Sequence, residues 1–106
     1  MVAVFPAVQA IVRVRLAPSL QCQAFERWLR AIPAVLHAAL VTGDVDYELQ
    51  LACHSFADLG DVLTRIRGCR GVQVESTALV LHEVTGLGQR RQTIPDEVTL
   101  RRVRSM

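Results

Sequence analysis

The segment from Thr42 to Tyr47, with the order Thr-Gly-Asp-Val-Asp-Tyr, carries the residue types and spacing best suited to binding chemistry. A glycine at the tip of a tight turn lets a ligand approach the backbone, and the N–H groups beside Gly43 can hold a carboxylate. Asp44 and Asp46 are one residue apart, so their carboxylates can receive an ammonium group. These two halves are complementary to an amino acid, and the segment is therefore a candidate binding site.

The same segment also has a simpler interpretation. Glycine followed by aspartate is common in turns, so Gly43 and Asp44 can serve only to reverse the chain. Asp46 can then serve only to form an ion pair across a subunit contact. Both interpretations stay open on spacing alone.

The other reactive residue types show no site spacing. The histidines form no HxxxH or similar ligand pair, and the odd number of cysteines contains no CxxC pair. We therefore expect no metal site, no cofactor and no disulfide framework, and the chain has no phosphate-binding or dinucleotide fingerprint. A nucleophile pair of Cys53 or Cys69 with a histidine has no local support. The residues concerned are His37, His54 and His82, with Cys22, Cys53 and Cys69.

Alternating polarity predicts the strands that must position the candidate segment. One strand is expected over residues 7–16 and another over residues 45–53. Residues 34–42 are apolar, too short for an independent helix, and run into the Gly43 turn, so they predict a strand joined to the next by a hairpin. The core face of the first strand would carry Ala10, Val12, Val14 and Leu16.

Two apolar stripes at helical spacing predict helices. The first is expected to start at Pro18 and Ser19 and to end at Pro33. The apolar residues of its stripe are expected to pack in the core rather than to bind a cofactor. The second starts at a capping box formed by Ser55 and Asp58. The first stripe consists of Leu20, Ala24, Phe25, Trp28, Leu29 and Ile32, and the second of Leu59, Val62, Leu63 and Ile66 before Gly68.

Gly71 opens a last predicted strand that continues to Val84, which completes the order strand, helix, strand, strand, helix, strand. That order predicts an α+β fold, the ferredoxin-like βαββαβ sandwich, in which a four-stranded antiparallel sheet carries both helices on one face. We assign residues 1–84 to this domain and residues 85–106 to a basic C-terminal tail.

The second face of the sheet is left bare by the elements of this chain. A second copy is its natural cover, which predicts a homodimer that packs sheet against sheet, as in a dimeric α/β barrel. Arg13 and Arg15 would then pair with Asp46 and Glu48. The predicted interface residues are Arg13, Arg15, Glu48 and Gln50, with Ile11 on the same face.

The net charge is too small by itself to argue for a nucleic-acid partner. Twelve basic against ten acidic residues give a net charge of only +2, and aromatic residues make up 5 %, too few for a surface that stacks bases. The two predicted helices are separated by two strands, so the chain has no helix-turn-helix. The basic tail could contact nucleic acid, but because it has no accompanying aromatic residues we expect a solvated extension or a subunit contact. Its arginines are Arg90, Arg91, Arg101, Arg102 and Arg104.

The composition also indicates a compartment. Apolar residues make up 51 %, as in a packed globule, yet no run reaches the roughly 18 residues that span a bilayer. The start of the chain lacks a charged signal-peptide region, and the unpaired cysteines suit a reducing environment. We expect a cytoplasmic protein with no membrane partner.

Two strings, VTGDVDYELQL at 41–51 and GVQVESTALVLHE at 71–83, resemble the effector-binding domain of the Lrp/AsnC (feast/famine) transcription regulators. The resemblance covers residues 7–84 and implies a domain that dimerises through its sheets, with dimers assembling up to octamers. It also implies that amino-acid effectors bind between dimers near the hairpin turn. By position, the effector-binding residues would be Thr42, Gly43, Asp44, Asp46 and Thr77.

The sequence departs from the usual family pattern beside that turn. Ala39 and Val45 stand where many members have an aromatic residue, Glu48 where an apolar residue is usual, and Ala78 where serine or threonine is common. The effector pocket is therefore expected to differ in shape. The family's DNA-binding helix-turn-helix has no counterpart in this sequence, which resembles the stand-alone form of the domain or a fragment.

Three hypotheses follow. The first is an effector-binding and oligomerisation module of a transcription regulator, which is not an enzyme. The second is a small dimeric α/β-barrel enzyme, such as a monooxygenase or isomerase, which would need a titratable group in a cavity between sheet and helices. The third is an adaptor that joins paralogues carrying a helix-turn-helix into mixed oligomers.

Overall fold

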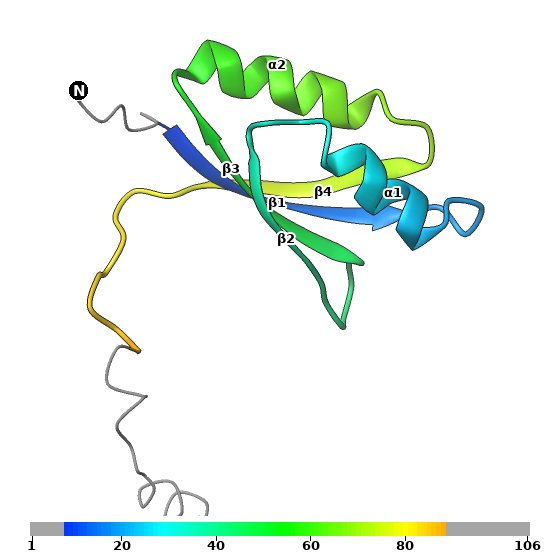
Figure 1. The fold of residues 1–106 in the computed structure, drawn as a ribbon, viewed down its shortest axis with the longest axis horizontal. Helices are drawn as coiled ribbons and strands as arrows, with labels where there is room; N and C mark the ends of the chain where they lie inside the picture. Colours follow the sequence, from blue (N-terminus) through cyan, green and yellow to red (C-terminus); the bar gives the residue numbers. More distant parts are fainter. Residues whose placement is uncertain (1–7, 89–106) are drawn as a thin grey trace, which may run out of the picture.

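The computed structural model describes residues 8–88 and shows one four-stranded antiparallel sheet with two helices (Figure 1). Both helices cover the same face of the sheet, and the strand order is β2-β3-β1-β4. The predicted α+β, ferredoxin-like βαββαβ fold is confirmed. In chain order the elements are β1 (Val8–Leu16), α1 (Cys22–Leu29), β2 (Val35–Leu40), β3 (Tyr47–Cys53), α2 (Phe56–Arg67) and β4 (Val72–Leu79).

The core lies between the sheet and the helices, as the alternating pattern predicts. Every second residue of the two central strands is buried. The apolar stripes of the two helices, as predicted from the sequence, pack against these residues. Phe25 packs against Tyr47 with ring centroids 5.0 Å apart and against Trp28 at 6.1 Å. The buried strand residues are Val8, Ala10, Val12 and Val14 in β1 and Tyr47, Leu49, Leu51 and Cys53 in β3.

The first helix is shorter than its apolar stripe predicts. Pro18 and Ser19 lie in a turn that closes with a 2.9 Å hydrogen bond from the N–H of Leu20 to the carbonyl oxygen of Ala17. The helix therefore begins three residues later, after Gln21, whose side chain makes no capping hydrogen bond. Because proline and serine favour turns as well as helix starts, the sequence pattern does not distinguish the two.

The second helix begins as predicted. The hydroxyl oxygen of Ser55 accepts a hydrogen bond of 3.1 Å from the N–H of Asp58, which caps α2. The helix ends at Gly68, and Gly71 then turns the chain into β4 with a φ of +89°. A Cβ atom at Gly71 would lie 3.2 Å from the side chain of Leu20. Both the positive φ and the close packing therefore favour glycine at this position.

The last strand ends earlier than predicted. The structure ends β4 at Leu79 rather than at Val84. After the strand ends, the N–H of Val80 still donates a 2.9 Å hydrogen bond to the carbonyl oxygen of Gln9 in β1. Residues 80–88 leave the sheet, at the end of β4 opposite to the loop between β2 and β3 (Figure 1). Of the predicted tail, residues 89–106 and their arginines lie outside the described residues.

Candidate functional site

The loop that joins β2 to β3 is wider than a two-residue hairpin. Leu40 and Tyr47 form the last strand pair, and the N–H of Val41 donates to the carbonyl oxygen of Asp46 over 2.9 Å. Gly43 has a φ of +112°, which side-chain-bearing residues rarely adopt, and no atom lies within 4 Å of where its Cβ would be. Residues 42–44 are exposed, so the tip of the loop, with its backbone N–H groups, is open to a ligand.

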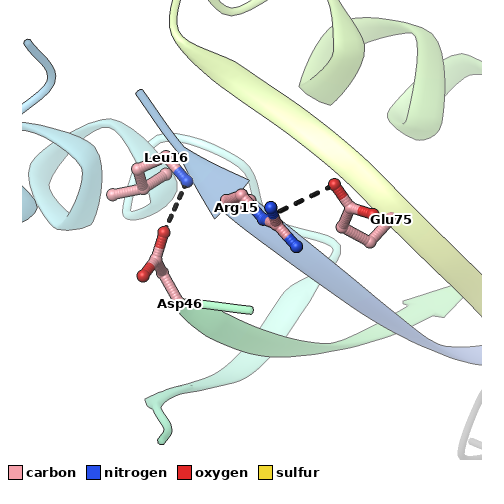
Figure 2. A network of polar contacts seen from close by, with 4 residues as sticks. All are labelled: Arg15, Leu16, Asp46 and Glu75. Atoms are coloured by element: carbon pink, nitrogen blue, oxygen red, sulfur yellow. Dashed lines mark hydrogen bonds and ion pairs between the residues drawn. The ribbon is translucent and has the colours of Figure 1, made fainter. Parts of the chain in front are cut away.

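The two aspartates of this loop have different roles. Asp44 is exposed, and its carboxylate makes no hydrogen bond or ion pair to the described part of the chain. The carboxylate of Asp46 accepts a 2.7 Å hydrogen bond from the N–H of Leu16 at the end of β1 (Figure 2). The N–H of Asp46 donates to the carbonyl oxygen of Val14 over 2.9 Å. Asp46 therefore joins the loop to β1, and Asp44 is the carboxylate left free for a ligand.

Thr77 lies away from the loop within one chain. It lies on β4, where it is paired with Val12 of β1, so β1 lies between it and β3, where the loop ends. With strands about 4.8 Å apart, the separation across the sheet alone is about 10 Å. Thr77 is exposed and does not lie beside the loop of its own chain.

The face of the sheet opposite the helices carries the predicted interface residues, and we call it the open face. Arg13 lies directly across from Glu48, with Nε and Oε2 3.7 Å apart, and Arg15 pairs with Glu75 over the same distance (Figure 2). Glu75 belongs to the irregularity where the register of β1 and β4 shifts, which the sequence did not indicate. Both ion pairs form within one chain and are well exposed, so each contributes at most about 1 kcal/mol to stability.

The predicted pairing of Arg13 and Arg15 with Asp46 and Glu48 across a dimer stays a prediction, because it concerns a second chain. Within one chain Arg13 already pairs with Glu48, and the carboxylate of Asp46 accepts a hydrogen bond from the N–H of Leu16. The pairing was inferred from side-chain types alone, and these do not reveal a backbone donor such as the N–H of Leu16.

A groove lies between α1 and the edge strand β2 on the helix side of the sheet, and we call it the α1–β2 groove. Its volume is about 280 Å³. At its inner end the hydroxyl of Tyr47, which is 1 % exposed, donates a 2.5 Å hydrogen bond to Oε2 of Glu26. The groove is lined by Glu26, Leu29, Arg30, Val35, Leu36, His37, Ala38, Leu40 and Tyr47.

No motif in the sequence predicts this groove. One weak signal is the spacing of Glu26 and Arg30, which lie one helical turn apart beside the Phe25 stripe. That spacing is common on solvated helix faces and is not specific. A tyrosine hydroxyl on an otherwise apolar strand face was the second, equally weak indication.

One hydroxyl and two thiols of the described chain have raised pKa values. Burial raises the pKa of the Tyr47 hydroxyl, and the hydrogen bond to Glu26 raises this pKa further. Burial raises the pKa of the Cys53 thiol and of the Cys69 thiol. These groups therefore make poor bases or nucleophiles at neutral pH, which weakens the enzyme hypothesis.

The remaining candidate residues lie apart. The three histidines are exposed on different segments, and the described residues contain no group of three or more metal-ligating side chains. Within residues 8–88, neither helix has the length and apolar character needed to cross a membrane.

Comparison with known proteins points to one family. A sequence profile described as the Lrp/AsnC ligand binding domain matches residues 9–87. A feast or famine regulatory protein from M. tuberculosis, solved in complex with L-methionine, is similar at 28 % identity with a TM-score of 0.67, over 78 % of this chain and 56 % of that one. The leucine response regulatory protein LrpA of the same organism has 28 % identity and a TM-score of 0.62, over 72 % of this chain and 51 % of that one.

AsnC from E. coli shares the fold at 20 % identity with a TM-score of 0.69, over 78 % of this chain and 60 % of that one. This chain therefore spans a little over half the length of the regulators that it matches. A search of the curated proteins returned no match.

Proposed function

The chain belongs to the Lrp/AsnC ligand-binding domain family, and from this premise we propose that it binds a small amino-acid effector at subunit contacts of a homo-oligomer. In this role it acts as the effector-sensing and oligomerisation module of a cytoplasmic transcription regulator. Its function is binding rather than catalysis.

The observation that carries the proposal is the open loop at residues 42–46. Gly43 leaves the backbone accessible, and the exposed Asp44 carboxylate has no partner in the described part of the chain. Backbone N–H groups suit a ligand carboxylate, and Asp44 suits an ammonium group. The regulator solved with L-methionine, which this chain resembles, supports an amino acid as the ligand.

A subunit contact is supported by the position of Thr77 and by the open face. Thr77 is two strands away from the loop in its own chain, so an effector that contacts both residues must lie between subunits. The open face presents Ile11, half buried, among exposed arginines and Gln50. A second copy packed on this face would give the proposed homodimer, from which larger rings up to an octamer can be built.

DNA binding is assigned to a partner rather than to residues 8–88. The two helices described are separated by β2 and β3, so they do not form a helix-turn-helix. A paralogue that carries such a module is therefore the proposed partner in regulation. The effector acts by binding unequally to two assembly states, because equal affinity for both would shift nothing.

Calorimetric titration of the full chain with each of the twenty amino acids tests the proposal. We expect at least one to bind, with a loss of ten-fold or more in affinity for Asp44→Ala. Light scattering on the same samples would show a change of mass when the effector is present. If no amino acid gives heat or changes the mass, effector sensing is wrong and only the assembly role is left.

A further inference from the structure

We propose that the helix α2 is a contact surface for a second copy of this chain, in which the two α2 helices lie antiparallel. The contact rests on the proposed homodimer and goes beyond it, because it lies on the helix layer and joins one sheet-to-sheet dimer to the next. We call the side of α2 that faces away from the sheet the outer side of α2. Its residues are exposed and comprise Phe56, Ala57, Gly60, Asp61, Thr64 and Arg67.

The outer side of α2 is uncovered and less polar than its residue types indicate. The helix packs on the core through Leu59 and Ile66, and no described element covers its other side (Figure 1). Phe56, the first residue of the helix, is 67 % exposed. The hydroxyl of Thr64 donates a 2.9 Å hydrogen bond to the carbonyl oxygen of Gly60. The outer side therefore presents an aromatic ring and a threonine whose hydroxyl proton is already bonded within the helix.

Gly60 lies near the middle of the outer side, where nothing in the described chain requires a glycine. It is not one of the glycines with a positive φ, and no atom lies within 4 Å of where its Cβ would be. Among residues other than proline, glycine is the least favourable in a helix interior, so Gly60 weakens α2. A glycine also lets a second backbone approach closely, and a helix of another copy that crosses at this point gives Gly60 a role.

The charges of α2 complement a second copy of the same helix. Asp58 and Asp61 lie in its first half, whereas Arg65 and Arg67 lie in its last turn. None of these four side chains forms an ion pair within residues 8–88. In an antiparallel pair each acidic half faces a basic half, whereas a parallel pair would oppose like charges. The same placement suits the helix dipole, so Phe56 and Gly60 point to a contact, and the charges select its orientation.

An antiparallel crossing between Gly60 and Thr64 also gives Phe56 a partner. Such a crossing sets Phe56 of one copy near the last turn of the other, where Arg67 lies. An arginine guanidinium stacks favourably on the face of an aromatic ring. Because the contact is two-fold symmetric, each pairing occurs twice.

The contact is too small to hold two chains together by itself. A helix of 12 residues is about 18 Å long, whereas a stable interface takes about 20–30 residues from each partner. It therefore acts only between chains that are already joined through their open faces. A dimer of that kind carries two α2 helices, so several weak contacts combine when dimers assemble into a larger particle.

Sedimentation of the full chain over a range of concentrations tests the contact. We expect particles larger than a dimer for the unmodified chain and dimers alone for Gly60→Gln, because a side chain at the crossing keeps the helices apart. Glutamine favours a helix more than glycine does, so Gly60→Gln should raise the unfolding temperature in dilute solution although assembly is lost. Arg27→Gln, on the exposed side of α1, is the control and should leave the mass unchanged.

A charge exchange on α2 tests the orientation of the two helices. Asp61→Arg should confine the chain to dimers, because it places like charges opposite each other. Adding Arg65→Asp to this variant should restore the larger particles, since the two positions again carry opposite charges. Thermal unfolding of each variant checks its fold, and this exchange carries the test if Gly60→Gln does not unfold cooperatively.

The outcomes separate the contact from the proposed function. If Gly60→Gln forms the same large particles as the unmodified chain, or the unmodified chain forms only dimers, the α2 contact is overturned and the proposed homodimer stands. Failure of the charge exchange to restore assembly overturns the antiparallel orientation. A monomeric unmodified chain overturns both the contact and the homodimer. If the masses follow the expected pattern but no amino acid binds, effector sensing is wrong and the α2 contact stands.

Discussion

The carboxylate of Asp46 accepts a hydrogen bond of 2.7 Å from the N–H of Leu16, thirty residues earlier in the chain. This bond satisfies a backbone donor at the end of β1, and Asp46 also donates its own N–H to Val14. The start of β3 and one end of the loop at residues 42–46 are thereby fixed to the central strand. The loop then presents Gly43 and Asp44 from a fixed base, which would reduce the ordering cost of the proposed effector binding.

Asp46→Ala should destabilise the fold by about 1–3 kcal/mol, because the N–H of Leu16 loses its acceptor in a partly buried position. Asp46→Asn keeps an acceptor oxygen without its charge and should cost less. Asp44→Ala removes an exposed carboxylate without described partners, so its cost should stay within about 0.5 kcal/mol. Urea unfolding of the three variants measures these differences. Equal losses for Asp44→Ala and Asp46→Ala would show that the hydrogen bond has no special role.

The two exposed glycines Gly43 and Gly60 should respond to alanine with opposite signs. Gly43 has a φ of +112°, so Gly43→Ala strains the backbone by about 1–3 kcal/mol although no neighbour would be touched. Gly60 lies inside α2 with no atom within 4 Å of an added Cβ, and Gly60→Ala should stabilise the helix by up to about 1 kcal/mol. Thermal unfolding midpoints should therefore fall for the first variant and rise for the second. A rise for both would mean that the loop tip readily adopts another conformation.

The strands and helices were predictable because each buries one face. A strand then shows alternating polarity, and a helix shows apolar residues three or four positions apart. β1, β3 and α2 were read from such patterns, and the Ser55 cap was found because its geometry is local. The start of α1 was missed because Pro18 suits a turn and a helix start alike. The partner of Asp46 was missed because a backbone N–H contributed by another strand leaves no trace in residue types.

The same limit applies to the candidate site. The turn at Gly43 and Asp44 could be predicted because a turn is local in sequence, and the binding role of its exposed residues stays a prediction. The α1–β2 groove depends on how a helix lies over an edge strand, which no spacing indicates. The length of β4 was overestimated because Leu81 and Val84 continue the apolar pattern beyond Leu79, where the strand ends.

Ile11→Asp should dissociate the proposed homodimer while leaving the core intact. Ile11 is paired with Gln50 on one side and with Ala78 on the other, so it lies inside the open face. A carboxylate there would lose its water in a sheet-to-sheet dimer, and this desolvation costs more than the apolar contacts of Ile11 contribute. Arg27→Asp, on the exposed side of α1, is the control. Sedimentation should give a monomer for the first variant and the unchanged mass for the second; an unchanged mass for both would place the subunit contact elsewhere.

Tyr47 should make the fold less stable in alkali. Its folded-state pKa is raised above the ordinary value of 10.0 by burial and by the hydrogen bond to Glu26, so the folded protein favours the protonated phenol. Below pH 10 both states are protonated and this contribution is fully present. Above pH 10 the unfolded chain releases the proton first, so stability falls as the pH rises, by up to about 1.4 kcal/mol per pH unit.

Tyr47→Phe should remove this fall. At pH 7 the variant should lose about 1 kcal/mol with the hydrogen bond to Glu26, and above pH 10 this deficit should shrink or reverse. The raised pKa values of Cys53 and Cys69 affect both proteins alike, so the difference between the two urea unfolding curves isolates the tyrosine. Because Tyr47 is the only tyrosine in the chain, absorbance of tyrosinate reports its ionisation directly. A native chain that ionises near pH 10, with parallel pH profiles for the two proteins, would contradict the buried hydrogen bond.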